Sequence, residues 1–229
     1  MSKNYSQLSL DERRTIYKLL ESGRSKTSIA EYPADQTFDD FRKKLRPREG
    51  GVANRLSKAD PGGLTNKGMS QKALDALRKA HPKWKLPTKP TQLSDQQITD
   101  VFRHEYYERP QIGKLDSIAG SKKTGSKLIE HVFDANIMTN STEVGKWLQQ
   151  SVDEAIGTDL RATRSSGKKE YDGIMGSQTR AALQKAVAQG KAKDINTKFS
   201  DKRIQYLRSL SNYSDNKNGW EDRVKNLRD

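Results

Sequence analysis

Two carboxylates and a hydroxyl lie close together in a glycine-rich stretch of the chain. Glu49 precedes two glycines, Asp60 precedes Pro-Gly-Gly, and Thr65 follows, so that 11 and then 5 residues separate the three side chains. Glycine and proline interrupt helices and strands, so turns are expected between the three. Hydrolysis of a glycosidic bond uses a pair of carboxyl groups on opposite faces of the sugar. Turns also collect Gly, Asp and Pro for conformational reasons, so the spacing alone leaves a structural interpretation open.

The composition restricts the class of protein. A chain of 229 residues forms one large domain or two small ones, and 32% hydrophobic with 31% charged residues indicates a modest core under a solvated surface. The net charge of +14 favours polyanionic partners: nucleic acid, anionic lipid or a carboxylate-rich wall polymer. The chain has no cysteine, and its three histidines lack metal-ligand spacing. We therefore expect no disulfide, no metal and no cofactor.

The beginning of the chain bears on where the protein acts. It reads MSKNYSQLSLDERR, which lacks the apolar segment of a signal peptide. No apolar run approaches the roughly 18 residues that span a bilayer. We expect a protein that is synthesised in the cytoplasm without a signal peptide and that has no membrane span.

The spacing of apolar residues predicts a mainly α fold. A helix from Thr37 to Leu45, with Phe38, Phe41 and Leu45 on one face, directly precedes the candidate site. A short β-hairpin around residues 50–66 is the only β-structure expected. Further helices are predicted at residues 70–82, 94–108, 126–138, 141–156, 176–189 and 200–210.

Several motifs in a fixed order resemble the family-108 glycoside hydrolases, the bacterial and phage N-acetylmuramidases. The motifs are E-G-G at 49–51, D-P-G-G-L-T at 60–65, F-R and Y-Y within 102–107, F-D at 133–134, W-L-Q at 147–149, D-G-I-M-G with a Thr within 172–179, and G-W with R-V within 219–224. The resemblance implies a lysozyme-like helical domain with a short β-hairpin at the active site. It also implies a helical type-3 peptidoglycan-binding module, whose D-G-x-x-G-x-x-T signature corresponds to Asp172–Thr179.

The resemblance divides the chain into three parts. Residues 1–35 are an N-terminal helical extension, residues 36–140 the muramidase catalytic domain, and residues 141–229 the peptidoglycan-binding module packed on it. Val52 stands where the family usually has an aromatic residue, which changes the expected shape of the saccharide groove.

The resemblance also assigns roles to individual residues. Glu49 is the proton donor, Asp60 acts from the opposite face, and Thr65 helps to position a water molecule, as in the Glu–Asp–Thr arrangement of phage-type lysozymes. Tyr107 is the candidate for packing against a pyranose ring, and Asn136 for a hydrogen bond to an N-acetyl group. For both, a place in the core is the open alternative, because each lies in a predicted helix.

The implied function is that of a lysozyme. Such an enzyme cleaves the β-1,4 bond between N-acetylmuramic acid and N-acetylglucosamine by general-acid catalysis. It would act on peptidoglycan in the periplasm or outside the cell, as an endolysin, a toxin-release enzyme or an antibacterial effector. Its other partners would be a delivery or secretion component, or an immunity protein. Basic residues expected to attract the wall are Lys122, Lys123, Lys127, Lys168 and Lys169.

A DNA-binding protein is the alternative function. Residues 5–30 resemble the start of a helix-turn-helix in a family of insertion-sequence transposases, and the net charge of +14 suits DNA. A helix-turn-helix reads DNA with its second helix, but here EYPADQTF interrupts the region where that helix belongs. The sequence therefore favours the muramidase and makes nucleic acid the less favoured partner. A wall-binding protein without catalysis is a third possibility, against which the presence of Asp60 and Thr65 beside Glu49 argues.

Overall fold

The computed structural model describes residues 36–49, 53–54, 63–119, 123–163 and 165–228. The expected N-terminal extension, and with it the segment that resembles a transposase, lies outside these residues. The chain forms two compact units, Met1–Thr99 and Asp100–Asp229. Within the described residues, no helix combines the length and the apolar character that crossing a membrane requires.

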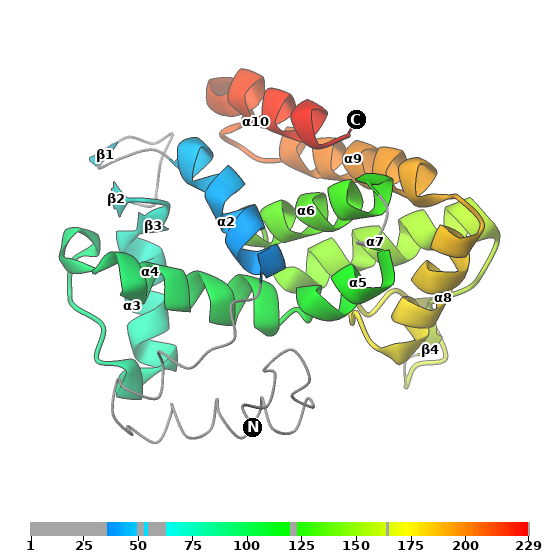
Figure 1. Ribbon diagram of the computed structural model, residues 1–229, viewed down its shortest axis with the longest axis horizontal. Helices are drawn as coiled ribbons and strands as arrows, with labels where there is room; N and C mark the ends of the chain where they lie inside the picture. The colour runs from blue at the N-terminus through cyan, green and yellow to red at the C-terminus, as the bar shows by residue number, and fades with distance from the viewer. Residues whose placement is uncertain (1–35, 50–52, 55–62, 120–122, 164, 229) are drawn as a thin grey trace, which may run out of the picture. The chain divides into compact units, whose positions relative to one another are not determined.

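The first unit combines short helices with a small antiparallel sheet (Figure 1). Strand β2 lies between β1 and β3. The elements are α2 (Gln36–Glu49), β1 (Ala53–Asn54), β2 (Leu64–Asn66), β3 (Met69–Ser70), α3 (Gln71–Ala80), and the 3-10 turns η3 (Pro82–Trp84) and η4 (Pro90–Gln92). The expected hairpin is confirmed, and a third strand extends it.

The β2–β3 hairpin owes its geometry to two turn residues. Lys67 and Gly68 have φ values of 49° and 84°, and such positive angles at both turn positions match the right-handed twist of the flanking strands. Asn66 is buried, and its Nδ2 donates to the carbonyl oxygen of Pro90 at 3.0 Å. Ser70 ends the sheet and begins α3, because its Oγ accepts a hydrogen bond from the backbone N–H of Ala73 at 3.2 Å.

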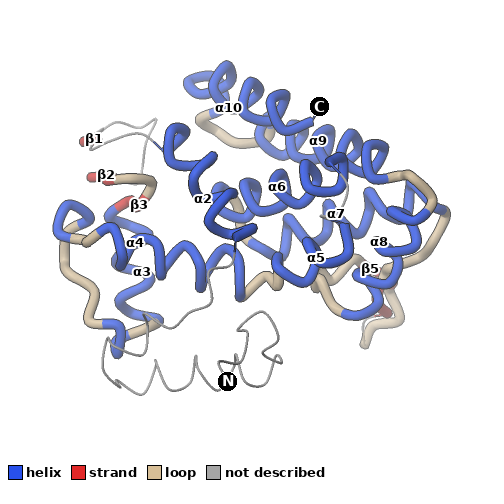
Figure 2. Tube along the Cα trace, viewed as in Figure 1, coloured by secondary structure: helices blue, strands red, loops and turns tan. Residues whose placement is uncertain are grey.

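The second unit is a bundle of helices with one small hairpin (Figure 2). Helix α4 (Asp95–Phe102) leads into it. Its further elements are the π-helical segment η5 (Arg103–Glu108), α5 (Ile112–Ala119), α6 (Lys123–Met138), α7 (Ser141–Ile156), β4 (Ala162–Thr163), β5 (Lys169–Glu170), α8 (Ser177–Ala188), α9 (Ala192–Arg208) and α10 (Tyr213–Arg228). Helices account for most of the described residues of both units, which confirms the mainly α fold.

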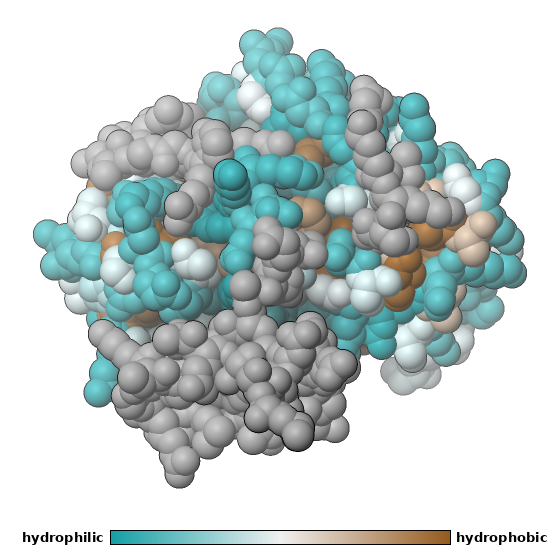
Figure 3. Space-filling view, viewed as in Figure 1, coloured by the Kyte–Doolittle hydropathy of each residue, from teal (hydrophilic) through white to brown (hydrophobic). Residues whose placement is uncertain are grey.

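Helix α9 is central to this bundle. It packs against α6, α7 and α10, and Phe199 on it is completely buried. The Phe199 ring contacts His131 of α6 and Trp147 of α7 edge-on, at centroid distances of 4.9 and 6.0 Å. Helix α6, which the sequence places with the catalytic domain, therefore packs with the C-terminal helices. The surface seen in Figure 3 is mainly hydrophilic, as the charged composition predicts.

A buried ion cluster joins three of these helices. Asp134 of α6 is 1% exposed and accepts a hydrogen bond from Arg203 of α9 at 2.7 Å and from Arg223 of α10 at 3.0 Å. Burial raises the pKa of the Asp134 carboxyl, but the two guanidinium groups outweigh burial and lower it. A carboxylate in this position is therefore ionised and holds α9 and α10 against α6.

Candidate active site

Glu49 is the last residue of α2, and apolar packing fixes the helix that carries it. Phe38, Phe41 and Leu45 are at most 3% exposed and repeat at spacings of three and four residues, which places them on one buried face. The predicted apolar face is thus confirmed, and the helix extends to Glu49.

Strand pairing brings the end of α2 close to Thr65. Ala53 of β1 pairs with Thr65 of β2, and only four residues separate it from Glu49. A chain spans at most ~3.6 Å per residue, so the Cα atoms of Glu49 and Ala53 lie within about 14 Å of each other. Paired antiparallel residues are about 4.5–5.5 Å apart. Glu49 and Thr65, 16 residues apart in the sequence, are therefore within about 20 Å of each other.

Asp60 belongs to the segment between β1 and β2. It lies outside the described residues, so its predicted role stays a prediction. The pairing of Asn54 with Leu64 joins the two strands on either side of this segment.

The Thr65 hydroxyl makes one long hydrogen bond. Its Oγ1 donates to the carbonyl oxygen of Gly63 at 3.3 Å, beyond the usual range of about 2.5–3.0 Å for a hydroxyl donor. Thr65 is half-buried, and the side chain of the next residue in the strand, Asn66, is buried. Successive side chains of a strand point to opposite faces, so the Thr65 side chain lies on the other face from Asn66. This arrangement suits a hydroxyl that orients a water molecule.

Tyr107 and Asn136 lie in the core of the second unit. Tyr107 is 2% exposed, and its ring meets Phe133 edge-on with a centroid distance of 5.9 Å. Asn136 is 1% exposed, and its Nδ2 donates to the carbonyl oxygen of Val132 at 2.8 Å. These positions favour the core alternative that the sequence leaves open for both residues. Their contact with substrate stays a prediction.

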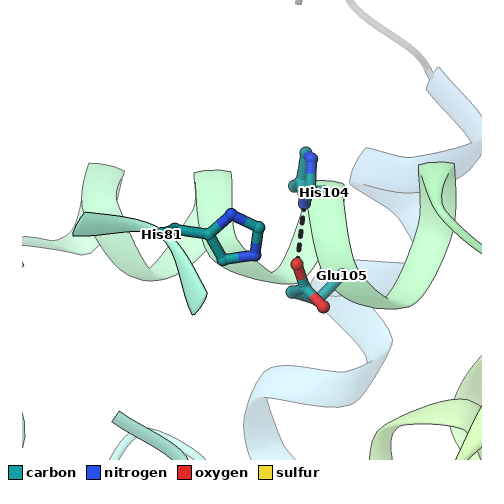
Figure 4. Close-up of side chains that lie close together, drawn as sticks. All are labelled: His81, His104 and Glu105. Carbon is teal, nitrogen blue, oxygen red and sulfur yellow. Dashed lines mark hydrogen bonds and ion pairs between the residues drawn. The ribbon is translucent and has the colours of Figure 1, made fainter. Parts of the chain in front are cut away.

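The sequence analysis missed a carboxylate in the π-helical segment. Glu105 accepts hydrogen bonds from Arg109 and shares one with His104, both at 2.9 Å; Figure 4 shows the contact with His104. Burial raises the pKa of Glu105, but the hydrogen bonds and charges of His104 and Arg109 outweigh burial and lower it to about 2. Glu105 is thus an ionised carboxylate, unsuited to donate a proton. The signal in the sequence was the Glu–Arg spacing of four residues beside a histidine.

A known protein family matches part of the chain. Residues 42–136 match the family model of Glycosyl hydrolase 108. The matched segment contains all five predicted site residues: Glu49, Asp60, Thr65, Tyr107 and Asn136. The match supports a glycoside hydrolase.

A solved structure shares the fold. The chain resembles the structure of Brucella abortus SagA with a TM-score of 0.63 and 24% sequence identity, over 85% of this chain and 93% of that chain. The shared fold extends well beyond the segment that matches the family model. Among curated protein sequences, none matches the chain.

Proposed function

We propose that this protein is a peptidoglycan hydrolase of the lysozyme type, which cleaves the β-1,4 bond between N-acetylmuramic acid and N-acetylglucosamine. The observation that carries the proposal is the family match over residues 42–136, which includes Glu49, Asp60 and Thr65. The pairing of β1 with β2 supports it, because it keeps the end of α2 close to Thr65.

The proposed mechanism uses three residues. Glu49 donates a proton to the glycosidic oxygen, and the bond from that oxygen to the anomeric carbon of N-acetylmuramic acid breaks. Asp60 acts from the opposite face of the sugar, where it activates water or stabilises the developing positive charge. Thr65 orients the water whose oxygen forms the new bond to the anomeric carbon. The products are a free hydroxyl on N-acetylglucosamine and a reducing end on N-acetylmuramic acid.

The C-terminal half is proposed to bind peptidoglycan. The loop that carries the D-G-x-x-G-x-x-T signature is fastened to α7 by Gln149. Its Nε2 donates to Asp172 Oδ1 at 2.7 Å, and its Oε1 accepts from the N–H of Gly173 at 2.9 Å. Thr179 closes the loop by donating to the carbonyl oxygen of Ile174 at 2.9 Å. A loop held in this way presents Ile174, which is 62% exposed, in a fixed position. A fixed exposed loop supports recognition, since little conformational entropy is lost on binding.

The substrate determines the proposed place of action. Peptidoglycan lies in the periplasm or outside the cell, so we place the activity there. A protein of this kind then needs a delivery or secretion component. An immunity protein is a further proposed partner if the enzyme acts on competing cells.

The substitution Glu49→Gln tests the proposal. An amide cannot donate the proton, so hydrolysis of purified peptidoglycan, followed as loss of turbidity, should fall by about 10²–10⁴. Glu143→Gln is the matched control, because Glu143 forms only a surface ion pair with Lys146 and lies outside the matched segment. Lysis by Glu49→Gln at the rate of the control would remove Glu49 from the catalytic role.

A further inference from the structure

One segment of the first unit carries a large excess of positive charge. From residue 72 to residue 89 the chain has six cations, Lys72, Arg78, Lys79, Lys83, Lys85 and Lys89, and one acid, Asp75. The charge of this short segment alone is +5, out of +14 for the whole chain.

The fold brings the two ends of this segment together. Lys72 and Lys79 are seven residues apart on α3, on the side opposite the buried Leu74 and Leu77. Gln71 Nε2 donates to the carbonyl oxygen of Thr88 at 2.8 Å, so the chain after η3 returns to the first turn of α3. Lys83 lies in η3, and Lys85 and Lys89 lie on this returning segment. We call the five lysines, Lys72, Lys79, Lys83, Lys85 and Lys89, the α3 basic face.

The α3 basic face has no counter-charge among the described residues. All five lysines are exposed, and none forms an ion pair with a described residue. Asp75, the one acid of the segment, accepts a hydrogen bond from Gln71 at 3.0 Å and lies 3.7 Å from Arg78. Like charges gathered in this way repel one another and attract an anionic partner.

Two of the lysines that the sequence analysis proposed for wall binding are paired. Lys168 Nζ lies 2.6 Å from Glu170, and Lys169 Nζ lies 3.0 Å from Asp159. Each of the two lysines thus has an acid beside it, although Lys169 shares Asp159 with Arg161. We therefore expect the α3 basic face, rather than these two lysines, to attract a polyanion.

We propose that the α3 basic face is a docking surface for the carboxylates on the peptide stems of a peptidoglycan strand. The inference rests on the proposed function. It is supported by a rigid connection to the candidate site: Thr65 pairs with Ser70, and Ser70 caps α3. A strand held on α3 is thus held near Thr65, one of the residues proposed to act in cutting it. Peptidoglycan fits because its stems carry carboxylates at regular intervals along the same glycan that the site would hydrolyse.

A charge-matched pair of variants tests the docking surface. The first removes four charges from the face: Lys72→Gln, Lys79→Gln, Lys83→Gln and Lys89→Gln. The control removes four exposed cations of the second unit that form no ion pair with a described residue: Lys185→Gln, Lys191→Gln, Lys193→Gln and Lys217→Gln. Both sets of substitutions remove the same amount of positive charge, so the two variants have equal net charge. Each is combined with Glu49→Gln, and binding to purified sacculi is measured by co-sedimentation.

The face variant should bind sacculi about tenfold more weakly than the control at ~0.1 M salt, from the loss of several weak charge contacts. The difference should vanish at ~1 M salt, where the Debye length falls from about 10 Å to about 3 Å. Sacculi whose carboxylates have been converted to amides should bind the parent protein as weakly as native sacculi bind the face variant. The measurement on amidated sacculi uses the parent protein, so it remains a valid test if the fourfold variant fails to fold.

Equal binding of the two variants, or unchanged binding of the parent to amidated sacculi, would overturn the inference. A face variant that loses affinity for duplex DNA but keeps its affinity for sacculi would overturn it in favour of nucleic acid. A different result would show that the proposed function is wrong. In that case the protein with Glu49 intact would release no glycan fragments from sacculi, whether or not the face variant binds them.

Discussion

The two units of the protein use positive charge in different ways. Residues 1–99 carry 20 cations and 11 acids, and residues 100–229 carry 23 cations and 18 acids. In the second unit many cations are matched with acids, and Asp134 joins three helices through two arginines. In the first unit the α3 basic face has no described acid partner. Buried positive charge thus holds helices together in the second unit, whereas the lysines of the α3 basic face have no such role among the described residues.

The motif residues of the two units also occupy different structural positions. In the first unit, Glu49 is the last residue of α2, and the half-buried Thr65 lies on the short strand β2. In the second unit, Asp134, Gln149 and Arg223 form the buried contacts that hold helices and a loop together. The motif residues of the second unit thus stabilise the fold.

The largest expected effect is on the ion cluster of the second unit. Asp134→Asn removes the buried carboxylate that binds Arg203 and Arg223, which should lower the free energy of unfolding by about 3–5 kcal/mol. Urea denaturation followed by circular dichroism measures this. Asp201→Asn, which breaks the exposed pair with Arg228, should cost at most about 1 kcal/mol. Equal losses in the two variants would mean that the charges of the second unit do not hold its fold.

The next effect concerns the contact between α7 and the signature loop. A Cβ at Gly145 would lie 1.9 Å from the carbonyl oxygen of Gly173, so Gly145→Ala should destabilise the protein by about 2–3 kcal/mol. Helix propensity alone predicts the opposite sign. Gly219 of α10 is the control: a Cβ there meets no atom within 4 Å, so Gly219→Ala should stabilise by about 0.5–1 kcal/mol. Thermal unfolding of both variants tests this contrast, and stabilisation by Gly145→Ala would contradict the close approach.

A smaller effect is expected from Glu105. Its pKa of about 2 in the folded protein lies below the 4.5 of the free side chain, so its stabilising contribution is complete above pH 4.5 and is lost as the pH falls towards 2. Over this pH range the Glu105→Gln variant should lose about 1–2 kcal/mol less unfolding free energy than the parent protein. Denaturation at several pH values measures the slope of the unfolding free energy against pH. An unchanged slope would show that His104 and Arg109 do not hold Glu105 ionised.

Local sequence patterns predicted the elements with strong apolar periodicity. Helix α7 begins and ends where expected, at 141 and 156, and α3 lies within the predicted range 70–82. Helix α10 was missed because its sequence is mostly polar and buries only Val224 and Leu227. The strand β3 was missed because two residues show no alternation.

The contacts over long sequence distances could not be predicted. Asp134 meets Arg203 and Arg223 at separations of 69 and 89 residues, for which no local pattern exists. Glu105 gave a local signal, but its low pKa arises because the hydrogen bonds and charges of His104 and Arg109 outweigh the effect of burial. The sequence also does not show which lysines pair with acids. For this reason the sequence pointed to Lys168 and Lys169 for wall binding, and not to the α3 basic face.

The most direct test of the central claim is the identity of the new reducing end. Purified sacculi are digested with the protein, the fragments are reduced with borohydride, and the reduced sugar is identified by mass spectrometry. The proposed function predicts reduced N-acetylmuramic acid, absent when Glu49→Gln replaces the parent protein. Reduced N-acetylglucosamine, or cleaved peptide stems with an intact glycan, would contradict it.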